Sequence, residues 1–174
     1  VNVVFNDCGF ERNGNLDELF SRDGQGGVAI YALDAPVIAN GCYFIGNVER
    51  TLVGSSNPPA TEREYQVNFR SSGCVTLHGN CGNSAFTNCL WLGNCGTYCN
   101  DDNSRMVGTS TNSAAVVVSL RNASDTVDFA NCTFAYNMSD SELSPTGILM
   151  LKGKGNAVNS IFTGAVTGTC SRVA

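Results

Sequence analysis

The sequence predicts an all-β protein with the architecture of a single-stranded right-handed parallel β-helix. Two observations lead to this prediction. A motif of the form Cys-x-aromatic-x-x-Asn occurs four times in the 174-residue chain, and internal repeats spaced in this way are typical of solenoids. The stretches between the copies are short runs of β-branched and aromatic residues broken by Gly, Asn and Ser, without a sustained 3.6-residue period.

The repeated motif defines the expected interior of the coils. Side chains alternate along a strand, so Cys and the aromatic residue two positions later share one face. That face is apolar and should point inward, where like residues of successive coils would stack about 4.8 Å apart. The Asn that closes each copy is expected in the following turn, in a left-handed conformation or bonded to nearby backbone. The predicted ladder is Cys8, Phe10, Cys42, Phe44, Cys89, Trp91, Cys132 and Phe134, with a degenerate fifth copy at Ser160, Phe162 and Ala165.

A second, weaker element precedes some copies of the motif. It is "GGVAIY" at Gly26 to Tyr31, "AAVVVSL" at Ala114 to Leu120 and "TGILML" at Thr146 to Leu151. The longest interval contains an expected exposed excursion over residues 48–65, marked by two adjacent prolines and several charges. We expect one domain over residues 1–174, with six or seven coils of about 25 residues each, and expect it to be part of a longer chain or of an assembly.

Composition narrows the class of protein. The net charge of −5 disfavours a basic surface that binds nucleic acid. No apolar run is long enough to span a membrane. Nine cysteines with a single histidine do not form zinc-type spacings, so an oxidising compartment is the better explanation, and no cofactor is expected. These features favour an extracellular or cell-surface location.

The cysteines fall into two groups. Those of the motif are expected to be small inward hydrophobes, with redox activity as the alternative. The cysteines outside the motif are disulfide candidates: Cys74, Cys81, Cys95, Cys99 and Cys170. The first four would form two local disulfides in one of three pairings. Cys170 would then be available to another part of the parent chain or to another subunit.

Three sequons are candidate glycosylation sites if the host glycosylates. They begin at Asn122, Asn131 and Asn137. Asn122 lies between two apolar runs and is the expected acceptor. Asn131 adjoins an inward Cys and should be hindered, and Asn137 is intermediate.

Few residues suggest catalysis or metal binding. Asp101 and Asp102 form an acidic pair, and together with Asn103 they offer hard oxygen ligands for a weak Ca²⁺ site. A solvated turn is the simpler interpretation, because the partner motifs of a β-helix hydrolase are missing. His78 has no identified carboxylate partner and is more simply structural. The aromatic residues considered for sugar contact are Trp91, for which the core is the stronger interpretation, and Tyr65, Tyr98 and Tyr136.

At this point the chain resembles a known family. "FERN", "FIGN", "FAYN" and, with Trp, "WLGN" match the FxxN signature, and "GGVAI" matches the GGAI signature with one inserted residue. These paired signatures are those of polymorphic outer membrane protein repeats. The resemblance extends from Phe5 to about Gly164 and implies a pectate-lyase-like β-helical solenoid of extracellular adhesins and surface proteins. Two departures are the absent autotransporter barrel and the five cysteines outside the motif.

The expected function is therefore non-enzymatic: an extracellular structural or adhesive segment of a surface stalk or filament. The alternatives are a carbohydrate-active enzyme of the pectate lyase or polygalacturonase type and a glycan-binding module. The expected partners are glycans and either a second copy docked end to end or a continuation of the parent chain, because open strand edges recruit further strands.

Overall fold

The computed structural model describes residues 1–13, 29–53, 74–100, 115–139, 146–164 and 166–167. Within these ranges the protein is all-β, with eighteen short strands. The side chains of 48–53, 96–100, 139 and 166–167 are outside the description. Within the described residues, there is no helix of the length and apolar character that crossing a membrane requires.

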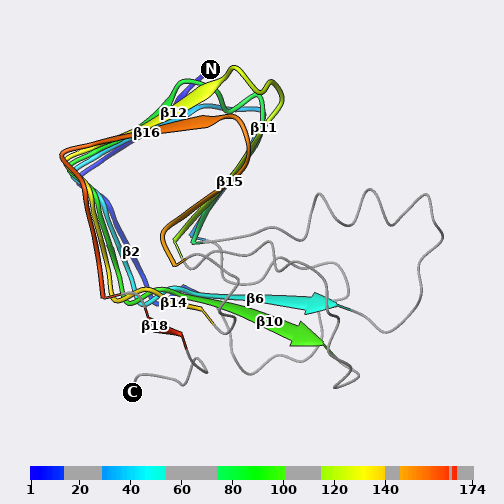
Figure 1. Ribbon diagram of the computed structural model, residues 1–174. Helices are drawn as coiled ribbons and strands as arrows, with labels where there is room; N and C mark the ends of the chain where they lie inside the picture. Colours follow the sequence, from blue (N-terminus) through cyan, green and yellow to red (C-terminus); the bar gives the residue numbers. More distant parts are fainter. Residues whose placement is uncertain (14–28, 54–73, 101–114, 140–145, 165, 168–174) are drawn as a thin grey trace.

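Four parallel sheets, which we name A to D, lie around a common interior (Figure 1). Sheet A contains β1 (Val3–Asn6), β4 (Val37–Asn40), β8 (Ser84–Thr87), β12 (Thr126–Ala130) and β16 (Lys154–Val158). Sheet B contains β2 (Gly9–Glu11), β5 (Tyr43–Ile45), β9 (Leu90–Leu92), β13 (Thr133–Ala135) and β17 (Ile161–Thr163). Sheet C contains β6 (Val48–Val53), β10 (Cys95–Asn100), β14 (Met138–Ser139) and β18 (Val166–Thr167). Sheet D contains β3 (Ile30–Leu33), β7 (Val75–Gly79), β11 (Val116–Leu120) and β15 (Ile148–Lys152).

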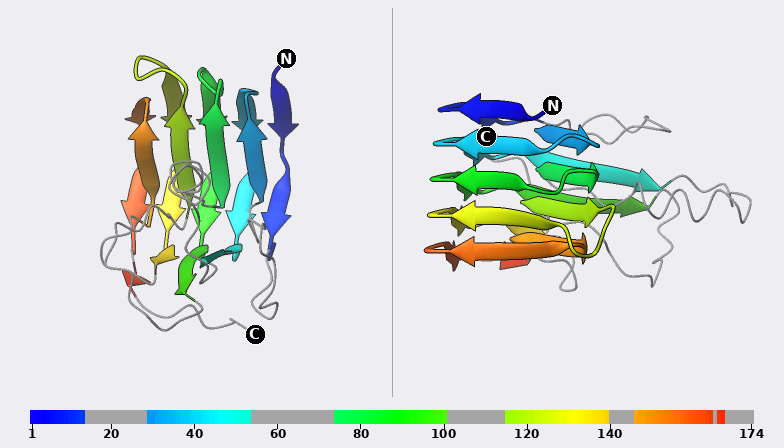
Figure 2. Two further views of the ribbon diagram at one scale, coloured as in Figure 1. Left: turned by 90° about the vertical axis from the view of Figure 1, so that its right-hand side faces the viewer. Right: turned by 90° about the horizontal axis from the view of Figure 1, so that it is seen from above.

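The chain visits the sheets repeatedly in the order D, A, B, C, and we call each pass a coil. Coil 1 contributes β1 and β2, and coils 2 to 5 contribute β3–β6, β7–β10, β11–β14 and β15–β18. The coils stack as layers in Figure 2. The described residues form five coils, which is fewer than the six or seven expected. Equivalent positions in coils 2 and 3, such as Asn47 and Asn94, are 47 residues apart, so a coil with its connection is longer than assumed.

Strand pairing keeps one register from coil to coil, except for a shift after Val118 where β11 pairs with β15. In sheet B, Phe44 faces Trp91 and Trp91 faces Phe134 across parallel pairs. In sheet D, Val75 pairs with Ile30 on one side and Val116 on the other. Like side chains therefore fall above like, which is the condition for continuous interior columns.

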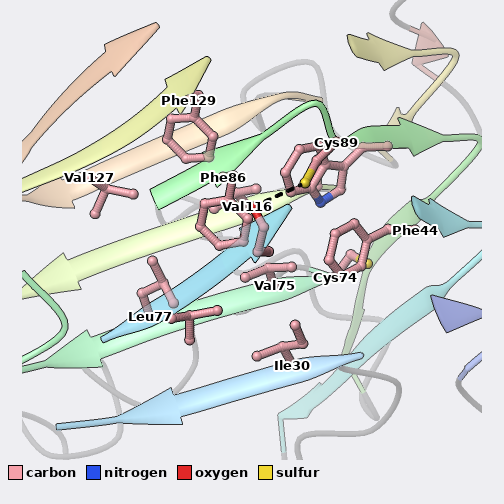
Figure 3. Packing of buried hydrophobic residues seen from close by; sticks show 14 of the residues in the cluster. Ile30, Phe44, Cys74, Val75, Leu77, Phe86, Cys89, Val116, Val127 and Phe129 are labelled. Carbon is pink, nitrogen blue, oxygen red and sulfur yellow. Dashed lines mark hydrogen bonds between the residues drawn. The ribbon is translucent and has the colours of Figure 1, made fainter. Parts of the chain in front are cut away.

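The core lies between the four sheets (Figure 3). Sheet A contributes Phe86 and Phe129, and sheet D contributes Val75, Leu77 and Val116, all nearly inaccessible to solvent. The β-branched residues suit these strands because their stiff side chains pack well on a pleated surface. Sheet A thus supplies a second aromatic column that the repeated motif does not include.

Each coil turns two sharp corners with left-handed backbone. Between sheets A and B, the residue just before the motif Cys has positive φ: Asp7, Gly41, Asn88, Asn131 and Asn159. Between sheets B and C, the residue just before the motif Asn does: Arg12, Gly46, Gly93, Tyr136 and Gly164. Of the two alternatives expected for the closing Asn, the left-handed conformation is not the one adopted by Asn47, Asn94 and Asn137, and the hydrogen bond to nearby backbone is confirmed. The closing Asn follows the corner and points inward.

Several sequence elements fall in one sheet. The described parts of "GGVAIY", "AAVVVSL" and "TGILML" form β3, β11 and β15 of sheet D. The fourth member, β7, lies in the cysteine-rich segment and does not carry the GGAI-like letters. The expected excursion over 48–65 is wrong at its start, because Val48–Val53 forms β6 paired with β10. Residues 54–65 and the short helical turn suggested at 16–20 lie outside the described residues.

Candidate functional site

The most regular chemistry of the described residues lies in three interior columns carried by the repeated motif. The aromatic column contains Phe10, Phe44, Trp91 and Phe134 stacked face to face, with ring centroids 4.5–4.9 Å apart. Phe162 of the degenerate copy extends it at 4.6 Å. These are the four residues that the register of the motif assigns to one column, and stacked rings add to the free energy gained by burial.

Trp91 differs from its column neighbours in one respect. Its side chain is fully buried, and its indole Nε1 is the buried side-chain polar atom without a hydrogen-bond partner among the described residues. A buried unpaired donor costs free energy. The unpaired N–H therefore costs free energy at this position, and the larger stacking surface of the indole ring offsets that cost. The burial agrees with the core interpretation of Trp91 over sugar contact.

The asparagine column is a continuous hydrogen-bonded ladder. Asn47, Asn94 and Asn137 are buried and polar. The backbone N–H and Nδ2 of Asn47 both donate to Oδ1 of Asn94, at 3.0 and 2.9 Å. The same two groups of Asn94 donate to Oδ1 of Asn137, each at 3.0 Å. Each rung thus satisfies its neighbour, which buried amides require.

The ladder also ties sheet B to sheet C across the coils. Nδ2 of Asn94 donates to the Phe44 carbonyl of the preceding coil at 2.9 Å. Asn47 makes the equivalent bond to Phe10, and Asn137 to Trp91. The amide fills both roles, donor and acceptor, in a fixed geometry. Asp would lose the donors, and Gln would be longer by one methylene.

The cysteine column lies beside the aromatic one. Each thiol donates to the carbonyl two residues earlier, and from Cys42 onward it also reaches a carbonyl of the preceding coil, as Cys89 does with Thr87 at 3.3 Å and Ala39 at 3.6 Å. Ser160 takes the same position in coil 5, with its hydroxyl near the carbonyls of Val158 and Phe129. Cys42, Cys89 and Cys132 are buried, and Cys8 is half-buried.

Two thiols in this column interact with each other. The nearby Cys89 thiol lowers the pKa of Cys132 to about 7. The nearby Cys132 sulfur, together with burial, raises the pKa of Cys89 above its ordinary value. Stabilising the thiolate at one sulfur necessarily disfavours it at the other. Of the described cysteines, Cys132 is the one whose thiolate is favoured.

The cysteines outside the motif correct one expectation. Cys74 and Cys81 are buried thiols, so neither takes part in the two local disulfides expected for this segment. The Cys81 thiol reaches the carbonyls of His78 and Ala32, and burial raises its pKa. Cys95 is disulfide-bonded, to a partner beyond the described side chains. The side chain of Cys99 and all of Cys170 lie outside the description.

The three sequons occupy different environments. Asn122 is exposed after β11, as expected. Asn131 is exposed at the corner between sheets A and B, and its Nδ2 donates only to Asn88 at the surface. Asn137 is 2% exposed and is a rung of the ladder. The expected order of Asn131 and Asn137 is therefore wrong, because the corner turns the Asn before Cys outward and the Asn after it inward.

The remaining candidates are scattered. His78 is half-buried in β7 of sheet D, and Tyr136 is exposed at a corner. Asp101, Asp102, Asn103 and Tyr65 lie outside the described residues, as does the side chain of Tyr98. In the part of the chain that the structure describes, no group of three or more His, Cys, Asp or Glu residues is arranged to hold a metal ion.

Among the described residues, each end face of the stack carries a cavity. At coil 1, a cavity of about 370 Å³ is lined by Val3 and Phe5 of β1 and by residues of β3. At coil 5, a cavity of about 190 Å³ is lined by Phe134, Phe162 and nearby backbone. Inward-facing apolar side chains of the two terminal coils are partly exposed, among them Val3 and Phe162.

Comparison with known proteins gives no family assignment. No protein-family model, curated protein or solved structure matches the chain. Function therefore has to be argued from the columns and the end faces.

Proposed function

We propose that the chain is a segment of a single-stranded right-handed parallel β-helix with a non-enzymatic, structural or adhesive role at the cell surface or outside the cell. The observation that carries the proposal is the continuity of the motif. The three inward positions of Cys-x-aromatic-x-x-Asn are used for stacking and hydrogen bonding between coils. Right-handedness is supported by the strong preference of parallel crossover connections.

The family resemblance supports the same role. The FxxN signature coincides with the strand of sheet B and the ladder Asn after it, as in Phe44 and Asn47. The GGAI-like signature ends in Ile30 and Tyr31 of sheet D. We infer that both signatures are stacking positions of a polymorphic outer membrane protein-type repeat, whose known members are extracellular adhesins.

The end faces support an extended assembly. Phe10 and Phe162 stack on one neighbour each within the described column, and both end faces expose apolar side chains. Stacked coils with open ends gain buried area by adding further coils. We propose that the stack is extended, either by a second copy docked end to end or by further coils of the parent chain.

Electron microscopy and size measurement of the native material test the proposal. We expect rods or filaments whose mass exceeds that of one chain, or a surface stalk that contains the chain. A monodisperse monomer of 18.3 kDa, unchanged by reductant, would contradict assembly and a longer parent together. Release of reducing sugars or unsaturated products from polygalacturonate by that monomer would favour the carbohydrate-active alternative.

A further inference from the structure

The corners between sheets A and B are joined from coil to coil by a series of backbone hydrogen bonds. At each step the N–H of the left-handed corner residue donates to a carbonyl of the following coil, as Asn131 does to Val158 at 3.0 Å. In coil 5 this donor position is held by the N–H of Asn159, for which the described residues offer no acceptor. In coil 1 the matching acceptor position is held by the Asn6 carbonyl.

The corners between sheets B and C repeat this arrangement. The N–H of Tyr136 donates to the Thr163 carbonyl of coil 5 at 3.1 Å. The next donor in the series is the N–H of Gly164, again without an acceptor among the described residues, and the Glu11 carbonyl is at the acceptor position in coil 1. Coil 5 therefore presents the donors, and coil 1 the acceptors, of the bonds that join one coil to the next.

The inward residues of sheet A match across the same two faces. Ala39 lies in register between two aromatic residues, Phe5 and Phe86. In coil 5, Ala157 pairs with Phe129 on one side and is exposed. Phe5 of a further coil 1 would give Ala157 the same two aromatic neighbours that Ala39 has. A small residue of coil 5 thus lies where a large one of coil 1 would fit.

The aromatic column of sheet B gives a second match. Phe162 stacks on Phe134 at 4.6 Å and is 50% exposed at the coil 5 face. Phe10 stacks on Phe44 at 4.9 Å and is half-buried at the coil 1 face. Placing Phe10 on Phe162 would bury both rings and continue the column with the same kind of stacking.

We propose that coil 1 of a second copy of this chain docks on coil 5 and continues sheets A and B in their existing register. These coils are the outermost layers of the described stack (Figure 2). Coil 1 has described strands in sheets A and B, so these two sheets carry the contact. The described part of coil 5 has two lysines and no acid, whereas coil 1 has one aspartate, one glutamate and one arginine, so the charges of the two faces are complementary. The inference rests on the proposed function and specifies its end-to-end assembly.

A photoreactive residue in the full chain tests the register. Val158 is exposed on the outward side of sheet A, and in the proposed junction it lies beside Asn6 of the next copy. Val158→p-benzoylphenylalanine should therefore link two chains on irradiation, and peptide mapping should identify the peptide that contains Asn6. Thr87 lies in the middle of the same outward column, so the probe at Thr87 is the matched control and should give no link between chains. A link from position 158 to any peptide outside coil 1 of the partner would overturn the register.

Two variants that each block one face test the pairing of unlike faces. Ala157→Glu places a carboxylate in the coil 5 face and Val3→Glu places one in the coil 1 face, at positions that are exposed in the single chain. Each should weaken self-association by at least about tenfold in analytical ultracentrifugation, because a buried unpaired charge is strongly disfavoured. Their mixture should form a dimer of twice 18.3 kDa and nothing longer, because each copy keeps one intact face. Thr87→Glu carries the same charge in the middle of the stack and should associate as the wild type does.

The outcomes separate this junction from the structural role. Dimers of Ala157→Glu alone would show that two coil 1 faces meet, and would overturn the inference. A recombinant wild type that stays monomeric at every concentration would overturn it too, whereas rods in the native material would still support the proposed function through further coils of a parent chain. Circular dichroism checks that each variant folds, and the photoreactive probe decides the register if a blocked variant does not.

Discussion

Trp91 in coil 3 and Phe162 in coil 5 occupy the same column, but they differ in how far they are enclosed. Trp91 is fully buried and stacks on Phe44 and on Phe134. Phe162 stacks on Phe134 and is 50% exposed. The degenerate copy in coil 5 keeps an aromatic residue at this position of the motif. The contribution of a repeat residue is therefore set by the coils on both sides of it, as expected for a quasi-one-dimensional stack.

The largest difference between the two regions is expected on removing an aromatic ring. Phe134→Ala deletes a buried ring that stacks on both Trp91 and Phe162, and should lower the free energy of unfolding by about 3–5 kcal/mol. Phe162→Ala is the matched control and should cost clearly less, because half of its surface is already in water. Urea unfolding measures both. Equal losses would show that position along the stack does not matter.

The asparagine ladder should show the next largest effect. Asn94→Ala leaves the two donors of Asn47 without their acceptor in a buried site, and should cost at least about 1–3 kcal/mol. Asn13→Ala is the control, because Asn13 is exposed and donates at the outer end of the ladder. A chevron or urea series compares the two. A loss at Asn13 as large as that at Asn94 would contradict the ladder argument.

The corner between sheets B and C gives a smaller, conformational effect. Gly93 has a φ of 61° and no atom within 4 Å of an added Cβ, so Gly93→Ala should cost about 1–2 kcal/mol from backbone strain alone. Gly164 has the same φ in coil 5, but its added Cβ would overlap the Tyr136 ring. Gly164→Ala should therefore cost more, and the excess should disappear when Tyr136→Ala is added. An excess that persists would point to another cause.

The smallest effect concerns glycosylation. In a glycosylating host, Asn122 and Asn131 should carry glycan and leave stability nearly unchanged, because both are exposed. Asn137 should be bare in the folded protein, because it is a buried rung. Glycopeptide mapping of the secreted protein measures occupancy. Glycan on Asn137 in material that is folded by near-ultraviolet circular dichroism would contradict its place in the ladder.

The aromatic column could be predicted because alternation along a strand fixes which residues share a face. Cys42 and Phe44 are two apart, so one inward position implies the other. The role of the closing Asn could not be predicted, because Asn suits both a left-handed turn and a buried amide ladder. The left-handed conformation belongs to the residue before the Asn, such as Gly46 or Gly93. The sequence does not show which of the two neighbouring residues adopts it.

The cysteines show a second limit of the sequence. Their number led to the prediction of an oxidising compartment, but number and spacing do not reveal which sulfurs point inward. Cys81 lies in a cysteine-rich segment and is nevertheless a core thiol held by the His78 carbonyl.

The predicted number of coils exceeds the number in the described residues for a related reason. The connections between coils carry no period, so the length of a coil cannot be derived from the strands alone.

The amides of the asparagine ladder all point the same way along the stack. The Oδ1 atoms of Asn94 and Asn137 each accept from the preceding coil, and the backbone N–H and one Nδ2 proton of Asn47 and Asn94 each donate to the following one. The other Nδ2 proton of each donates back to the preceding coil, so the shared direction is that of the side-chain carbonyls. Their dipoles therefore add, and neighbouring bonds polarise one another. The ladder therefore has a net dipole along the stack, with its negative end toward coil 1. Two stacks joined at their coil 1 faces would oppose like poles, whereas stacks that share one direction would continue the field, so any fibre built from these coils should itself have a direction.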